Sequence, residues 1–151
     1  MATEIERKFL VTGELPDGED TEIVQAYLNL DPKRTTRVRI ESGQATVTIK
    51  GKTRGISRVE FEYPIPLDDA RELVKIALGV PIEKTRRRVR AGEFTWEIDT
   101  FHGANAGLVV AEIELQSETD DFQKPAWLGA EVSDQSRYVN ARLVEQPFSS
   151  W

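Results

Sequence analysis

Apolar and polar residues alternate along most of the chain, and clusters of Gly, Pro, Asp and Asn interrupt the alternation at regular intervals. A period of two residues is typical of strands that bury one face, and the interruptions are typical of turns. The pattern predicts eight strands, over residues 3–11, 22–30, 35–41, 44–50, 57–65, 82–91, 94–100 and 108–116. Ser42-Gly43 and Ala91-Gly92 are typical of tight hairpin turns between neighbouring strands.

One segment, residues 68–78, breaks the alternation and is predicted to be a helix. Its apolar residues recur at helical spacing: Ala70, Leu73, Val74, Ala77 and Leu78. Asp68 or Asp69 fits the N-cap, and Gly79 followed by Pro81 fits the end of a helix. Short helices are also expected over residues 119–123 and 136–144. The chain is therefore predicted to be a single β-dominated α+β domain over residues 1–151.

Side chains two residues apart on a strand share a face, and the two faces of the predicted strands differ sharply. One face is apolar, with Phe9, Val38 and Trp96 among its residues. The other carries rows of a single charge sign, acidic over residues 97–99 and 112–114 and basic over 37–39 and 84–90. An antiparallel sheet with one solvated face is the simplest interpretation of such alternation. Rows of like charge on adjacent strands repel, however, and this favours a closed barrel whose interior holds ions of opposite sign.

Composition narrows the chemistry available to such an interior. The chain of 151 residues has 26 acidic and 20 basic residues and a net charge of -6, which argues against a nucleic-acid-binding surface. It has no Cys and one His, His102, which excludes disulfides, thiolate catalysis and cysteine-bound metals. No apolar run is long enough to cross a bilayer and the N-terminus does not fit a secretory signal, so no membrane partner and a cytoplasmic location are expected.

The remaining groups indicate a metal ion and phosphate. Carboxylates as the available ligands favour a hard cation, Mg²⁺ or Mn²⁺, over zinc. Several Arg and Lys side chains around one cavity suit an anion with many phosphoryl oxygens, because guanidinium groups bind phosphate bidentately. No credible nucleophile is present for a covalent route. Attack of metal-activated water on phosphorus is the simplest mechanism that these residues predict.

Residues 4–8, Glu-Ile-Glu-Arg-Lys, resemble the E-x-E-x-K opening strand of the CYTH superfamily, also called triphosphate tunnel metalloenzymes. Six further motifs resemble that family's in the same order: Arg37-Val38-Arg39, Thr48-Ile49-Lys50, Arg58-Val59-Glu60-Phe61-Glu62, Lys84-Thr85-Arg86, Glu97-Ile98-Asp99 and Glu112-Ile113-Glu114. Arg137-Tyr138 followed by Asn140 is similar to its C-terminal helix. A lone E-x-E-x-K is weak evidence, whereas seven motifs in order are specific.

The resemblance implies an eight-stranded antiparallel, closed β-barrel with a few flanking helices. It implies hydrolysis of inorganic triphosphate to diphosphate and phosphate with Mg²⁺ or Mn²⁺, with triphosphate as the small-molecule partner. The metal set carried over is Glu4, Glu6, Glu60, Glu62, Glu97, Asp99, Glu112 and Glu114. The phosphate-binding set is Lys8, Arg37, Arg39, Lys50, Arg58, Lys84, Arg86 and Arg137. Catalytic roles are expected for Glu4, Glu6, Lys8, Lys84 and Tyr27.

The chain departs from the family at Ser136, where short bacterial members often carry Lys before the Arg-Tyr pair. Arg137 is expected to take over part of that role. Two other functions stay open: an adenylate cyclase of the CYTH type, and a non-catalytic polyphosphate-binding module. Outer apolar positions that the few helices do not cover suggest a homodimer.

Overall fold

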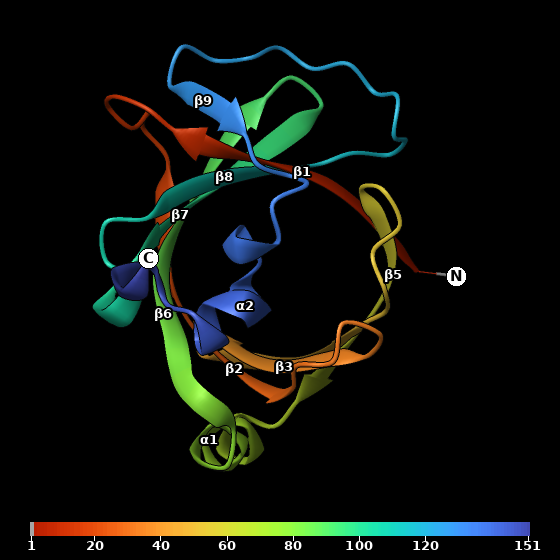
Figure 1. The fold of residues 1–151 in the computed structure, drawn as a ribbon, viewed down its shortest axis with the longest axis vertical. Helices are drawn as coiled ribbons and strands as arrows, with labels where there is room; N and C mark the ends of the chain where they lie inside the picture. The colour runs from red at the N-terminus through yellow and green to blue at the C-terminus, as the bar shows by residue number, and fades with distance from the viewer. Residues whose placement is uncertain (1) are drawn as a thin grey trace.

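A computed structural model describes residues 2–151 as an eight-stranded antiparallel barrel (Figure 1). Its strands are β1 (Thr3–Val11), β2 (Glu19–Asn29), β3 (Thr35–Glu41), β4 (Gln44–Lys50), β5 (Ser57–Ile65), β6 (Leu78–Ala91), β7 (Phe94–Phe101) and β8 (Val109–Glu114). The order around the barrel is β1–β8–β7–β6–β2–β3–β4–β5, and pairing of β5 with Thr3–Ile5 of β1 closes it. The predicted closed barrel is confirmed, and Ser42 and Gly43, both with positive φ, form the β3–β4 turn.

A ninth strand, β9 (Leu128–Glu131), was not predicted. It pairs with β1 at Phe9 and Val11, along the edge that β5 leaves free beyond Ile5. Four residues are too few to show an alternation, so the sequence carries no signal for this strand. The partner edge on β1, which only the folded barrel provides, determines where it forms.

The helix predicted over residues 68–78 is α1 (Leu67–Lys75), and both of its predicted ends are wrong. Pro66 occupies the N-cap position without a side-chain hydrogen bond, and the two aspartates lie in the first turn, where they favour the helix dipole. The chain re-enters extended structure at Leu78, because β6 begins there opposite Tyr27 of β2. Leu78 is consequently 46% exposed and outside the core.

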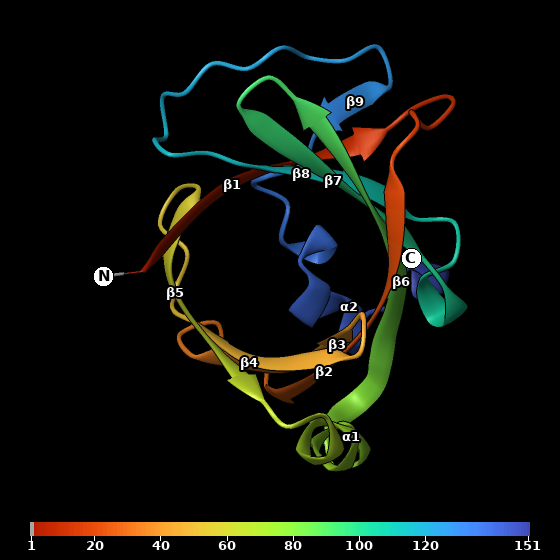
Figure 2. The same cartoon turned by 180° about the vertical axis from the view of Figure 1, so that it is seen from behind.

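The short helix predicted over residues 119–123 is absent, and that prediction is wrong. Asp120 accepts hydrogen bonds from the backbone N–H groups of Gln116 and Ser117, which form a turn. The segment between β8 and β9 runs along the outside of the barrel (Figures 1 and 2). There Phe122 and Trp127 pack edge-on against Trp96. The packing of these aromatic side chains, not helical periodicity, places the segment.

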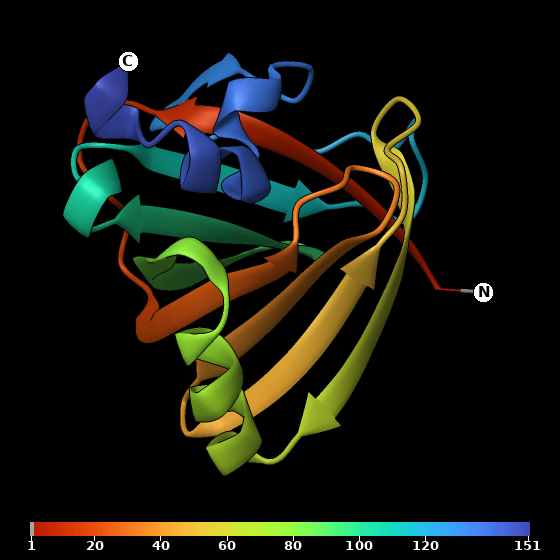
Figure 3. The ribbon, with the colours of Figure 1, turned by 60° about the horizontal axis from the view of Figure 1, so that its bottom comes forward.

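The predicted helical stretch over residues 136–144 is present as two short elements, and a third follows it. They are the 3₁₀-helix η2 (Ser136–Tyr138), α2 (Asn140–Glu145) and, beyond the prediction, the 3₁₀-helix η3 (Phe148–Ser150). A further 3₁₀-helix, η1 (Gly103–Asn105), links β7 to β8. Figure 3 shows α2 lying across one end of the barrel. Within residues 2–151, no helix has the length and apolar composition to cross a membrane.

Two of the three apolar clusters lie outside the ring of strands, between the barrel wall and the segments that cover it. One cluster joins Phe9, Trp96 and Ile113 to the covering loop. A second packs α1 on Val38, whereas the third joins Tyr138 and Leu143 to the inward-facing Tyr27 and Ile82 at one end of the barrel. Because apolar side chains point outward to these layers, the alternate residues of each strand point into the barrel. The outer face of β4 and β5 is left uncovered at Ile49, Phe61 and Tyr63, and the homodimer stays a prediction.

Candidate active site

The interior of the barrel contains a cavity of about 380 Å³, lined by inward-facing side chains of the strands β1–β8 and by residues 132–141. In both views along the barrel, α2 lies within the outline of the ring of strands (Figures 1 and 2). Val139, Asn140 and Ala141 form part of the lining. The C-terminal segment therefore closes one end of the cavity.

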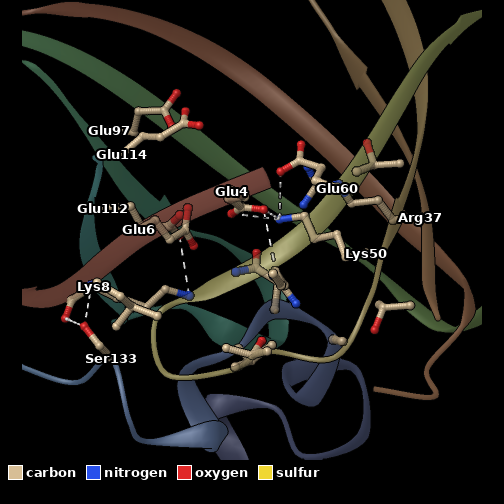
Figure 4. Close-up of a pocket in the computed structure, with 18 of the residues that line it drawn as sticks. Glu4, Glu6, Lys8, Arg37, Lys50, Glu60, Glu97, Glu112, Glu114 and Ser133 are labelled. Carbon is tan, nitrogen blue, oxygen red and sulfur yellow. Dashed lines mark hydrogen bonds and ion pairs between the residues drawn. The ribbon is translucent and has the colours of Figure 1, made fainter. Parts of the chain in front are cut away.

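Most of the residues predicted for the site line this cavity. They are Glu4, Glu6, Lys8, Tyr27, Arg37, Arg39, Lys50, Arg58, Glu60, Glu62, Lys84, Arg86, Glu97, Glu112 and Glu114. Figure 4 shows Glu97 and Glu114 toward one end and Lys8 and Ser133 toward the other, near α2. Strand alternation predicted their common face, because it turns every second residue inward.

Asp99 and Arg137 were predicted for the site but do not line the cavity. Asp99 is fully buried in the wall, where Lys84 Nζ donates to Oδ2 at 2.7 Å and Arg86 Nε to Oδ1 at 2.7 Å. Both of its oxygens are therefore engaged by cations. Arg137 is exposed, and its guanidinium lies 4.3 Å from the ring centroid of Trp151. The structure thus places one residue behind the cavity and the other outside it.

Several lining residues were not predicted for the site. They are Thr35, Glu41, Thr48, Thr53, Gly55, Ile56, Arg88, Val132, Ser133, Gln135, Val139, Asn140 and Ala141. Glu41, Thr48 and Arg88 share strand parity with the predicted residues, so the same pattern indicates them. Residues 132–135 follow β9 in an irregular turn, and no periodicity indicates that they return to the barrel.

One wall of the cavity carries cations without carboxylate partners. Arg37 and Arg39 project inward from β3, and within residues 2–151 neither guanidinium forms an ion pair within 4.0 Å. Arg37 is buried and its Nε has no hydrogen-bond partner, while Arg39 donates to the neutral amide oxygen of Gln25. Burial, with the charges of Arg37 and Arg86, lowers the pKa of Arg39 to about 10. A buried cation without a counter-charge is costly, so this wall favours binding of an anion.

The opposite wall is acidic, and β8 lies four strands from β3 in either direction around the barrel. Glu114 of β8 pairs in register with Glu6 of β1, whereas Glu112 pairs with Glu97 of β7 on one side and with Lys8 of β1 on the other. Like charges on directly opposed residues destabilise a sheet. This wall therefore favours binding of a cation.

The protonation of these carboxylates reflects their crowding. Burial and the charges of Glu112 and Glu4 raise the pKa of Glu6 well above its usual value. Burial and a hydrogen bond with Glu4 raise the pKa of Glu60 to about 7. Burial opposes ionisation of Glu4 itself, but the proton shared with Glu60 and the charges of Lys50 and Arg58 lower its pKa. Neighbouring carboxylates that share protons are the groups that a divalent cation stabilises when it replaces those protons.

The donor set fits a hard divalent cation. Every candidate ligand is a carboxylate oxygen, and Glu6 lies close enough to Glu4 and to Glu112 for these side chains to shift one another's pKa. In residues 2–151 no three acidic or histidine side chains yet converge as a ready-made set of ligands. Lys50 Nζ lies 2.9 Å from Glu4 Oε2, and Lys8 Nζ lies 3.5 Å from Glu112 Oε1. Cation binding would therefore require these lysines to release their carboxylates.

The fold and its interior define a class of protein: a closed eight-stranded antiparallel barrel with a charged cavity. The family model named CYTH domain matches residues 2–142, and the chain belongs to this family. It is 41% identical over its full length, and over 99% of the relative, to an inorganic triphosphatase of Acetivibrio thermocellus. It is 35% identical to an inorganic triphosphatase of Nitrosomonas europaea, covering 94% of this chain and 97% of that one. A crystal structure of an inorganic triphosphatase matches it with a TM-score of 0.68 and 33% identity, covering 95% of each chain.

Proposed function

We propose that this chain, acting as one CYTH-like domain over residues 1–151, hydrolyses inorganic triphosphate to diphosphate and phosphate with Mg²⁺ or Mn²⁺. The observation that carries the proposal is the pair of guanidinium groups, buried in Arg37 and half-buried in Arg39, that face an acidic wall without carboxylates of their own. A polyanion accompanied by a hard cation supplies both missing counter-charges. Full-length similarity to named inorganic triphosphatases supports the choice of polyanion and of a divalent metal.

The basic side chains bind and orient the chain of phosphates. Arg37 and Arg39 have free donors for phosphoryl oxygens, and their planar groups favour bidentate contacts. Lys84 and Arg86 extend this surface along β6, and Lys50 and Arg58 extend it toward Glu4. Once a divalent cation binds the carboxylates, Lys8 and Lys50 lose their present partners and become available to phosphate.

The acidic side chains hold the cation. Glu4, Glu6, Glu112 and Glu114 are the proposed ligands, with Glu60, Glu62 and Glu97 nearby in the same cavity. When bound, the cation neutralises phosphoryl charge and activates water for attack on phosphorus. Asp99 holds Lys84 and Arg86 in place from within the wall.

Three further groups are placed to assist cleavage at the closed end. Lys8 donates to the carbonyl of Tyr138 at 3.0 Å, and Lys84 donates to Asn140 Oδ1 at 2.9 Å. Both ammonium groups can neutralise charge on the departing phosphate. The hydroxyl of Tyr27 accepts a hydrogen bond from Gln25, which leaves its own proton free to donate to substrate.

Release of phosphate from triphosphate and from ATP, in Mg²⁺, in Mn²⁺ and in EDTA, tests the proposal. Fast, metal-dependent release from triphosphate with slow release from ATP is expected. Formation of cyclic AMP and diphosphate from ATP would instead establish a cyclase. Tight binding of triphosphate without turnover would reduce the protein to a binding module.

A single substitution links the test to the cationic wall. Arg39→Ala is expected to raise KM for triphosphate about 100-fold, because it removes a charge-assisted bidentate contact. The matched control is Arg71→Ala on the exposed surface of α1, which should leave KM unchanged. An unchanged KM in Arg39→Ala would place Arg39 outside the substrate site.

A further inference from the structure

Gln25 of β2 is a completely buried, neutral side chain that pairs in register with Arg39 of β3. Its Oε1 accepts two hydrogen bonds from Arg39, from Nε at 3.1 Å and from an Nη at 2.9 Å. Its Nε2 donates to the hydroxyl of Tyr27 at 3.2 Å and to Asn140 Oδ1 at 3.0 Å. The amide oxygen and nitrogen are both used in fixed directions, so the side chain has one orientation.

Asn140 extends this contact to the closed end of the cavity. It is the first residue of α2, and its Oδ1 accepts from Lys84 Nζ at 2.9 Å as well as from Gln25. Two neutral amides thereby connect Arg39 of β3 to Lys84 of β6. The same hydrogen bond joins α2 to β2 in the barrel wall.

An amide and a carboxylate affect a neighbouring guanidinium differently. Asp99 accepts from Arg86 with a full negative charge and so neutralises it. Gln25 accepts from Arg39 through the same number of nitrogen atoms but carries no charge. Arg39 is therefore oriented without being neutralised, which keeps its attraction for an anion.

We infer that Gln25 and Asn140 are positioning residues that orient Arg39 and Lys84 toward the triphosphate. Because Asn140 belongs to α2, the orientation of both cations depends on the position of α2 in the barrel. The inference rests on the proposed function, since it concerns how the same cavity binds its substrate. The amides need not touch the substrate. They act through the cations that do.

A double-mutant cycle between Gln25 and Arg39 tests the first link. Gln25→Ala should raise Kd and KM for triphosphate about tenfold with kcat changed by less than about threefold, because one oriented contact to the phosphate is lost. In an Arg39→Ala background the same substitution should change Kd by less than about twofold, because its target is gone. Additive effects would show that Gln25 does not act through Arg39.

The charge of the acceptor supplies a second, independent test. Gln25→Glu keeps the size and the acceptor oxygen but adds a negative charge beside Arg39. We expect it to weaken triphosphate binding more than Gln25→Ala does, by about a further threefold or more, because it neutralises the guanidinium. A structural role exerted through the Arg39 contact alone predicts the reverse, since Glu keeps the volume and the acceptor oxygen. The Nε2 donor to Tyr27 and Asn140 is lost in both variants. Binding by Gln25→Glu equal to wild type would overturn the inference.

Asn140 and a surface control complete the experiment. Asn140→Ala should raise Kd for triphosphate, and a cycle with Lys84→Ala should be non-additive in the same way. Gln44→Ala, at the exposed β3–β4 turn, should leave Kd and KM unchanged. Thermal melting of every variant separates a loss of binding from a loss of fold.

Calorimetry with triphosphate in EDTA measures Kd for every variant of the double-mutant cycles without requiring turnover. Wild type that binds triphosphate but does not hydrolyse it in Mg²⁺ or Mn²⁺ would refute the proposed function. The cycles would still show whether Gln25 and Asn140 act through Arg39 and Lys84. Wild type that hydrolyses triphosphate while both cycles are additive would refute the network alone. Wild type that binds triphosphate neither in EDTA nor in Mg²⁺ or Mn²⁺, and does not hydrolyse it, would refute both.

Discussion

Strands β3 and β8 lie on opposite sides of the barrel, and their inward-facing charges differ in sign and in the partners that surround them. On β3, Arg37 and Arg39 have no carboxylate partner and are held by burial and a neutral amide. On β8, Glu114 faces Glu6 across the strand register, and Glu112 faces Glu97 on one side and Lys8 on the other. Burial opposes the charge of Arg37, and Tyr27, Glu4 and Glu60 raise its pKa, but neither carboxylate lies within 4.0 Å of the guanidinium.

Asp99 of β7, with Lys84 and Arg86 of β6, forms a cluster in which each buried charge has a partner of opposite sign. Asp99 engages Lys84 and Arg86 at hydrogen-bonding distance, with no side-chain surface exposed to solvent. Such a cluster stabilises its own geometry and leaves the carboxylate no free oxygen for a ligand. The compensated carboxylate of Asp99 is therefore expected to matter for folding, whereas the uncompensated groups that line the cavity are expected to matter for binding.

The largest effect should follow from neutralising an uncompensated carboxylate. Glu6→Gln is expected to lower kcat for triphosphate about 1,000-fold or more, because it removes a proposed cation ligand. It should also raise the unfolding free energy of the metal-free protein at pH 8 by about 1 kcal/mol, since the raised pKa of Glu6 marks an ionised form that the fold disfavours. Steady-state kinetics and urea unfolding measure the two effects.

The control for this substitution is Glu93→Gln, at the exposed β6–β7 turn, which should change neither quantity. A Glu6→Gln protein with wild-type turnover would remove Glu6 from the cation site. A Glu6→Gln protein less stable than wild type at pH 8 would show that the ionised carboxylate of Glu6 is stabilised by partners of opposite charge in the folded protein.

Asp99→Asn should have the opposite balance, with a large cost in stability. Removing this charge leaves Lys84 and Arg86 buried without a counter-charge, and breaking a buried ion pair in this way costs about 3–5 kcal/mol. Urea unfolding in EDTA measures the loss. A variant of wild-type stability that had lost only metal affinity would return Asp99 to the metal set predicted from the sequence.

The outcome for Asp99 illustrates how far the sequence could predict the site. Strand parity and ordered motifs sufficed for the barrel and for inward residues such as Glu112 and Arg39, because both depend on a local period of two. Whether an inward residue faces the cavity or is engaged by neighbours depends on cross-strand register, which pairs Asp99 with Arg86. Residues such as Ser133 and the strand β9 lie in irregular sequence, and long-range contacts with β1 alone place them.

A smaller effect is expected from the pH dependence of the acidic wall. The pKa of Glu60 is about 7 in the folded protein, against an ordinary 4.5, so between these values the folded state keeps a proton that the unfolded state has lost. Stability from this group therefore falls as pH rises from 5 to 7, by about 1 kcal/mol given its partial exposure. The lowered pKa values of Glu4, Glu112 and Asp99 give contributions that are already complete above pH 5.

Unfolding of wild type and Glu60→Gln at pH 5, 6 and 7, each in EDTA, isolates this contribution. The substitution should make the profile flatter, because Gln imitates the protonated form at every pH. Added Mg²⁺ should flatten the wild-type profile in the same direction, since a cation replaces the shared protons. Parallel profiles for the two proteins would show that Glu60 titrates normally.

The smallest effect is expected at Arg137, a basic residue that the sequence assigned to phosphate binding. Its guanidinium stacks 4.3 Å from the ring of Trp151, outside the cavity lining. Arg137→Ala should therefore change KM for triphosphate by less than about twofold and lower the unfolding free energy by about 0.5–1 kcal/mol, the usual worth of an exposed cation–π contact. Arg39→Ala provides the contrast on the same scale, with its large KM effect. A tenfold rise in KM for Arg137→Ala would mean that the C-terminal segment turns this side chain into the cavity when substrate binds. In that case η2 would belong to the substrate-binding site and not to the outer surface.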